Sequence, residues 1–186
     1  MFIGRSIATQ IAAHKVEAAA HALSVITIDA DKDWQGKSIT NFKQLSLIHC
    51  GGIRLEDTLL EDLCWSGLII EGTAGEILAQ FQTVYRKDDE KYWLAKANLA
   101  TTMPVVAMAV EAIAAEAVGK FLLLGWIRDD RWTLTAGQPA YQSVADFGAV
   151  TTTIPSGSGD QVQRVGIALT DVIAHFNPIY TVFEIT

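Results

Sequence analysis

The sequence predicts a mainly β fold, a small β-barrel or sandwich, with a helical or coiled-coil arm at its amino-terminal end. Short apolar runs alternate with stretches rich in Gly, Pro, Asp and Ser, and these turn-forming stretches recur roughly every 8–12 residues. A heptad-like spacing near the start of the chain predicts the arm. The runs expected to form strands are 121–126, 132–134, 162–169 and 173–176.

Composition bounds the class of protein. The chain has 186 residues, of which 50% are hydrophobic and 19% charged, so it can form one domain, or one domain with an arm, around a substantial core. The net charge is −7 and the 14 basic residues are scattered, which argues against a nucleic-acid partner. The chain therefore reads as an acidic globular protein.

Neither a signal peptide nor a membrane span is expected. Polar residues interrupt the apolar stretch near the start of the chain, and Pro104, Glu111 and Glu116 interrupt the longest apolar tract, 103–118. The two cysteines, Cys50 and Cys64, are too few for a disulfide framework. We interpret them as reduced or buried, while a pairing between them stays open.

Residues 1–28 are predicted to form the arm. Its apolar positions follow alternating spacings of four and three residues, as in the a/d seam of a coiled coil, and alanine is abundant. The resulting oligomerisation seam consists of Ile7, Ile11, His14, Ala18, His21 and Val25. The alternative is a single helix on the surface of the β-domain. In a symmetric bundle the two histidines would form stacked rings able to hold water or an anion, with a metal site as the less favoured interpretation.

Residues 29–72 are predicted to be an intertwined β segment leading into the domain. Asp29, Asp31 and Asp33 alternate as in a calcium loop, but the required glycine and glutamate are missing. The segment D-W-x-G-K-x-I-T-N resembles the motif at which the shaft begins in bacteriophage tail fibres and other elongated virion proteins. Its matching residues are Asp33, Trp34, Gly36, Lys37, Ile39, Thr40 and Asn41. The resemblance implies a parallel homotrimer whose chains complete one another's core.

Residues 73–186 are predicted to form the carboxy-terminal β-domain from two related units. Each reads as an Ala-Gly turn, a strand with an aromatic residue, a tight turn, a second strand and a V-x-x-A-type strand, over 74–109 and 136–168. Two such units closing on each other would remove exposed sheet edges. The alanine-rich stretch is assigned by this repeat to a strand at 106–110, followed by a turn or short helix at 112–117.

The run P-S-G-S-G-D-x-V-Q-x-V-G-x-A, from Pro155 to Ala168, is the strongest part of a second resemblance. Together with glycines, aromatics and prolines across 119–178, it resembles a β-rich domain near the carboxy termini of many phage structural proteins. The resemblance extends over about residues 74–186. It implies a virion component and leaves open whether that is a tail fibre, a head fibre or a capsid-decorating protein.

No enzyme motif is present, and we expect neither catalysis nor a cofactor nor a metal. Glu56, Asp57, Glu61 and Asp62 read as a solvated face, and 156–159 as a turn. Neighbouring His49 and Cys50 would point to opposite faces of a strand. His175 is interpreted as a satisfied edge residue. The tryptophans and tyrosines could stack on sugars, although most are expected to be core or inter-subunit anchors.

The expected function is a virion structural protein, most simply a short homotrimeric fibre attached to the tail or head. Its partners would be itself, other capsid or tail proteins and a host surface glycan. A capsid-decorating protein that stabilises the shell and a glycan-binding fibre tip are the alternatives.

Overall fold

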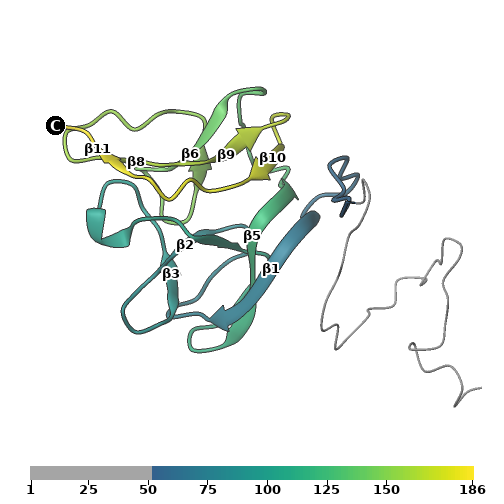
Figure 1. Cartoon of the computed structure of the whole chain (residues 1–186), viewed down its shortest axis with the longest axis horizontal. Helices are drawn as coiled ribbons and strands as arrows, with labels where there is room; N and C mark the ends of the chain where they lie inside the picture. Colours follow the sequence, from purple (N-terminus) through teal and green to yellow (C-terminus); the bar gives the residue numbers. More distant parts are fainter. Residues whose placement is uncertain (1–51) are drawn as a thin grey trace, which may run out of the picture. The chain divides into compact units, whose positions relative to one another are not determined.

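The strand β5 (Val118–Arg128) is the longest of the fold and pairs with three others. The computed structural model describes residues 52–186, drawn as ribbon in Figure 1. β1 (Trp65–Thr73) runs antiparallel along nearly all of one edge of β5. β4 (Ala107–Ala109) pairs with the amino-terminal half of the other edge and β10 (Ile173–Phe176) with its carboxy-terminal half. Two arms of the sheet therefore start from the same edge of β5.

The three outer strands of the second arm repeat the strand order of the first arm, and β10 is added between them and β5. In the first, β2 (Thr83–Arg86) pairs with both β3 (Tyr92–Leu94) and β4, and β4 pairs with β5. In the second, β6 (Pro139–Gln142) pairs with both β7 (Val150–Thr151) and β9 (Arg164–Ala168), and β9 pairs with β10. These strands lie where the sequence repeat predicts its two units.

Together these nine strands form one sheet that curls into a half-barrel (Figure 1). A separate two-stranded sheet joins β8 (Gln161–Val162) to β11 (Phe183–Glu184). Within residues 52–186 the helical content is one 3-10 turn, Ala100–Thr102. The prediction of a mainly β fold is confirmed.

The far ends of the two arms come back together through backbone hydrogen bonds. Thr83 N–H donates to Gly148 O over 2.9 Å, and Gly148 N–H donates to Ala95 O over 2.8 Å. Ala97 N–H donates to Ser143 O over 2.9 Å. The two arms separate at β5 and are joined again by these hydrogen bonds. They therefore enclose an interior, and side chains from both arms fill it.

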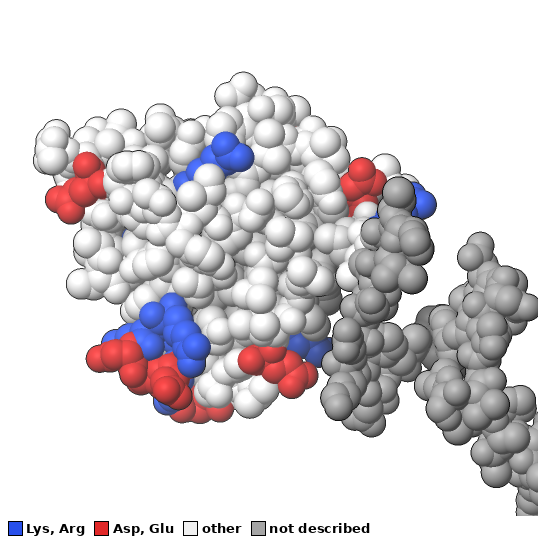
Figure 2. Space-filling model, in the orientation of Figure 1, with Lys and Arg blue, Asp and Glu red and all other residues white. Residues whose placement is uncertain are grey.

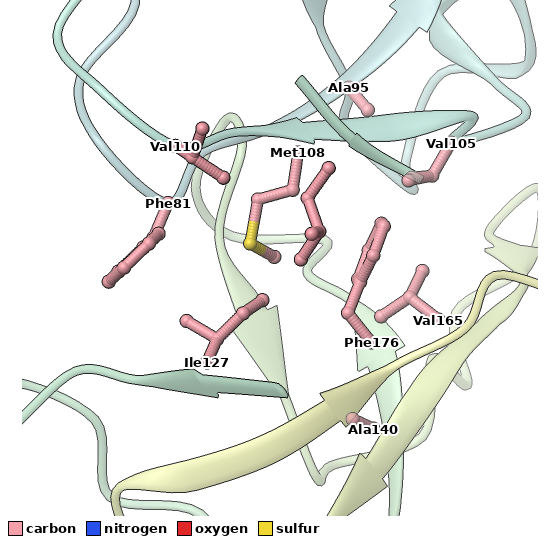
Figure 3. Packing of buried hydrophobic residues seen from close by; sticks show 10 residues of the cluster. Phe81, Ala95, Val105, Met108, Val110, Ile127, Ala140, Val165 and Phe176 are labelled. Atoms are coloured by element: carbon pink, nitrogen blue, oxygen red, sulfur yellow. The ribbon is translucent and has the colours of Figure 1, made fainter. Parts of the chain in front are cut away.

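The central core fills that space. Met108 lies among side chains from both arms, with Ile127 and Phe176 beside it (Figure 3). Burial of such side chains stabilises the fold by about 1.5–3 kcal/mol each. The buried members are Phe81, Ala95, Val105, Met108, Val110, Leu122, Ile127, Ala140, Val165 and Phe176.

A second core lies on the opposite face of β4 and β5. Phe121 belongs to it, whereas its neighbour Leu122 belongs to the central core, and both are fully buried. Ala107 and Ala109 likewise face the second core while Met108 faces the central one. β4 is therefore buried on both faces, and this explains why its sequence is continuously apolar rather than alternating.

Several predictions can be compared with these residues. A strand in 106–110 is confirmed by β4, and 112–117 contains a turn instead of a helix. The predicted strand at 132–134 is wrong: Trp132 N–H donates to Asp129 O over 3.0 Å, and this turn takes the chain out of the sheet. The end of segment 29–72 forms β1, in the same sheet as the rest of the domain. The arm 1–28 lies outside the described residues.

Candidate functional site

Two adjoining hollows on the surface share two consecutive residues, Arg131 and Trp132. The first has a volume of about 190 Å³ and is lined also by Gln82, Asp129 and Phe147. The second has a volume of about 150 Å³, and Thr133, Thr151 and Thr152 are among its lining residues. We call the two together the Arg131–Trp132 groove.

A tight turn after β5 positions the shared residues. Asp129 N–H donates to Val172 O over 2.9 Å, which fixes the start of the turn to the loop before β10. The Asp129 carboxylate then accepts a hydrogen bond from the Arg131 N–H over 3.0 Å. Aspartate favours such turns because its side chain bonds the backbone two residues on.

The Arg131 guanidinium forms a bidentate ion pair with Asp129. Its Nε donates to Oδ1 over 2.8 Å and its terminal nitrogen donates to Oδ2 over 2.7 Å. The Asp129 side chain is 3% exposed and that of Arg131 is 62% exposed. Hydrogen bonding to Asp129 raises the pKa of Arg131 above its ordinary value. The groove thus presents the planar guanidinium of Arg131 as a hydrogen-bond donor. Its orientation is fixed by the bidentate contact with the buried Asp129 carboxylate, which also balances its charge.

Trp132 joins the groove to the interior. It is half-buried, packs against the central core, and its ring centroid lies 6.3 Å from that of Phe81. The other tryptophans in residues 52–186 have different partners. Trp93 donates to Asp89 over 3.1 Å, Trp126 lies 4.5 Å from His175 between ring centroids, and Trp65 packs on the core.

Gln82 and Phe147 complete the wall of the first hollow. Gln82 Oε1 accepts a hydrogen bond from Ala79 N–H over 2.7 Å, which leaves the amide nitrogen as its donor group. Phe147 is 44% exposed, and Lys96 Nζ lies 4.7 Å from its ring centroid. The hollow therefore combines an exposed aromatic ring with fixed polar groups.

A second surface feature is the outer edge of β1. Within residues 52–186, β1 pairs with β5 alone, so the backbone groups of its other edge have no strand partner there. Leu68 and Ile69 are exposed on it, at a register shift. The edge of β3, in contrast, is covered: Tyr92 O accepts from Gly75 N–H over 2.8 Å, and the Glu76 carboxylate accepts from Leu94 N–H over 2.9 Å.

One face of the domain is largely free of charge. Figure 2 shows that most Lys, Arg, Asp and Glu side chains gather at its margins, that one basic group lies in its upper part, and that its middle has no charged side chains. White in this view marks every residue other than Lys, Arg, Asp and Glu, polar residues included, so the face is poor in charge and offers little to an ionic ligand.

The residues singled out in the sequence fall into three groups. All six seam positions lie outside the described residues, as do Cys50, His49 and the D-W-x-G-K segment. The four acidic residues at 56, 57, 61 and 62 are exposed, and 156–159 lies in a turn where Gly157 N–H donates to Asp160 over 2.7 Å. His175 is not at an edge, because β10 lies between β5 and β9.

Sequence reasoning missed the groove. Arg131 and Asp129 were visible only as the charged turn R-D-D-R, and nothing in the sequence places Gln82 and Phe147 beside them. In the described part of the chain no group of three or more His, Cys, Asp or Glu side chains is arranged to hold a metal ion. Nor does any helix there reach the length and apolarity of a membrane span. Comparisons with family models, curated proteins and solved structures gave no match.

Proposed function

We propose that this chain is a structural protein of a bacteriophage virion, assembled as a short homotrimeric fibre on the tail or head. Its work would be mechanical and adhesive. Support comes from the all-β build of residues 52–186, its largely uncharged face and the two sequence resemblances. In this proposal residues 1–28 form a helical arm whose seam brings three chains together.

The observation that carries the assembly part is the open edge of β1. Among residues 52–186 the outer edge of β1, nine residues long with Leu68 and Ile69 exposed, has no strand partner, and such an edge is a template for pairing with another chain. Proteins that stay monomeric usually blunt such edges with charged residues, proline, a β-bulge or a covering loop, and of these devices β1 has Glu71 and the register shift between Leu68 and Ile69. β1 contains neither lysine nor proline.

The number of chains depends on what pairs with β1. Pairing of β1 with β1 of a second copy is isologous and closes as a dimer. Pairing of β1 with a different segment of the next copy is heterologous and can close as a ring of three. The trimer proposal therefore requires the heterologous arrangement.

Light scattering during gel filtration of the full chain tests this proposal. We expect three times the chain mass of 20.2 kDa, retained on dilution. A mass of two chains would indicate isologous pairing, and a clean monomer would also overturn the trimer. Monomeric chains that bind saturably to expanded phage capsids and raise their heat stability would instead identify the decoration alternative.

Two test variants and one control locate the contact that holds the assembly. Leu68→Lys places a charge on the β1 edge and should lower the mass, whereas Ile77→Lys makes the same change at an exposed site outside β1 and should not. The double variant Ile7→Asp with Ile11→Asp tests the seam in the same assay. A trimer that persists in Leu68→Lys and also in the double variant Ile7→Asp with Ile11→Asp would contradict the assembly proposed here.

A further inference from the structure

We infer that the Arg131–Trp132 groove binds a neutral oligosaccharide of at least two sugar rings. All of its lining residues come from one chain, so the inference stands independently of how many chains assemble. The inference assigns glycan binding to specific residues, which the sequence analysis did not identify as a site.

The chemistry of the first hollow suits a sugar ring. A sugar offers an apolar face of C–H groups together with hydroxyls that both donate and accept hydrogen bonds. Phe147 and Trp132 provide apolar aromatic surface. Gln82 and the Arg131 fork provide donors whose positions are fixed by their own bonds to Ala79 and Asp129.

The charge balance favours a neutral ligand. The Asp129 carboxylate and the Arg131 guanidinium form an ion pair without net charge, and among residues 52–186 they are the only charged residues that line the two hollows. Lys96 lies outside this lining, with its Nζ 4.7 Å from the ring centroid of Phe147. An anionic ligand would have to compete with a buried carboxylate already in bidentate contact. A hydroxyl, in contrast, can accept from the outer N–H groups of Arg131 without disturbing that pair.

The size of the two hollows favours at least two rings. Volumes of about 190 and 150 Å³ are each below the ~300 Å³ at which pockets for drug-sized ligands begin. Each hollow therefore takes a group about the size of one ring. Thr133, Thr151 and Thr152 line the second hollow. The Thr151 hydroxyl already accepts from Thr153 N–H over 3.0 Å and the Thr152 hydroxyl bonds Thr135, but a hydroxyl oxygen can accept two hydrogen bonds and the Thr151 hydroxyl can still donate. A linear oligosaccharide crossing Arg131 would fill both hollows.

The test uses the full chain and a defined set of probes. Neutral hexose oligosaccharides of one to four rings, in gluco, galacto and N-acetyl forms, are titrated alongside their uronic-acid counterparts and short peptides. We expect affinity to rise roughly tenfold between one ring and two, with little selectivity for the uronic acids. Titration calorimetry or ligand-observed NMR measures the constants.

Matched variants tie the binding to the groove. Phe147→Ala should weaken binding roughly tenfold, while Phe183→Ala, at another exposed phenylalanine outside both hollows, should leave it unchanged. Gln82→Glu keeps the oxygen that accepts from Ala79 and removes the donor, and should also weaken binding. Unchanged melting temperatures show that these variants remain folded.

Three outcomes would overturn the inference. The first is an absence of binding to every neutral probe in the millimolar range. The second is preferential binding of uronic acids or of peptides. The third is neutral-sugar binding that Phe147→Ala and Gln82→Glu both leave intact, because the sugar would then lie elsewhere.

Discussion

The side-chain amide of Gln163 hydrogen-bonds both the N–H and the carbonyl of Val105. Its Oε1 accepts from Val105 N–H over 2.7 Å, and its Nε2 donates to Val105 O and to Ile179 O, each over 2.9 Å. The side-chain amide of Gln142 likewise bonds two residues of the first arm. Its Oε1 accepts from the Thr83 hydroxyl, and its Nε2 donates to Ala95 O over 3.0 Å. Both glutamines are fully buried, and they join the second arm to the first where no strand pairing does.

Replacing Gln163 should strongly destabilise the domain. Gln163→Leu leaves the Val105 N–H buried without a partner, and we expect the free energy of unfolding to fall by about 2–4 kcal/mol. Chemical denaturation measures this loss. Gln138→Leu, at an exposed glutamine, is the control and should change stability by less than about 0.5 kcal/mol. Equal effects of the two changes would show that the bridge to Val105 contributes little.

Gly125→Ala should be among the most damaging small changes in the sheet. Gly125 lies opposite Gly67 on β1, and a Cβ at Gly125 would lie 2.7 Å from Gly67 Cα and would also meet the Ser66 carbonyl. Because backbone cannot move aside as a side chain can, we expect a loss of about 1–3 kcal/mol.

Gly52→Ala is the matched control for this glycine, since a Cβ there would meet nothing within 4 Å. Thermal unfolding of the two variants compares them. Similar melting temperatures would contradict the close approach of β1 to β5.

His175 should make stability depend on pH on the acid side of neutrality. Burial lowers the pKa of His175 below its ordinary value of 6.5. Below pH 6.5 the unfolded chain therefore binds a proton more readily than the folded chain, so the free energy of unfolding falls as the pH decreases. More than about one pH unit above 6.5, His175 is largely neutral in both states and contributes little such dependence.

His175→Phe isolates this effect because it preserves a ring beside Trp126. When the pH is lowered from about 7.5 to about 5.5, the natural chain should lose free energy of unfolding through His175, whereas the variant should not. The variant should therefore become more stable relative to the natural chain over that range. The shift should be below about 1 kcal/mol, since His175 is only half-buried and solvent screens its charge. A constant difference over that range would refute the prediction.

The Asp129–Arg131 pair should respond asymmetrically to mutation. Arg131→Ala leaves the buried Asp129 carboxylate without its cation, whereas Asp129→Asn leaves an exposed cation in water. We expect Arg131→Ala to cost more, about 1–2 kcal/mol after solvent screening of the exposed partner. The double variant Asp129→Asn with Arg131→Ala should recover part of the free energy of unfolding that Arg131→Ala alone loses. Urea unfolding measures both variants, and a double variant less stable than Arg131→Ala would contradict the prediction.

Much of the strand pattern could be predicted because turn-forming residues bound each strand locally. The run 173–176 coincides with β10, and the repeat located β2, β3 and β4 as well as β6, β7 and β9. The run 132–134 failed because Trp132 and Leu134 are apolar for another reason: they pack into the cores from an irregular segment. Periodicity cannot separate these two causes of apolarity.

The candidate site could not be predicted, because its parts meet only in the folded chain. Gln82 and Phe147 come from different arms, and Arg131 lies in the connection between them. The central hydrogen bonds of Gln163 and Gln142 also span residues far apart in sequence. The seam at residues 1–28 and the homotrimer stay predictions.

The division of the sheet into two arms has a consequence for where the chain could be cut. One exposed turn, residues 135–138, follows the groove and leads into the second arm, while the central core lies between the arms as an interface lies between subunits. The peptide link there acts mainly by setting a high effective concentration of one half for the other. The domain is in this sense an intramolecular heterodimer, and a break at that turn should leave two fragments that reassemble by binding each other.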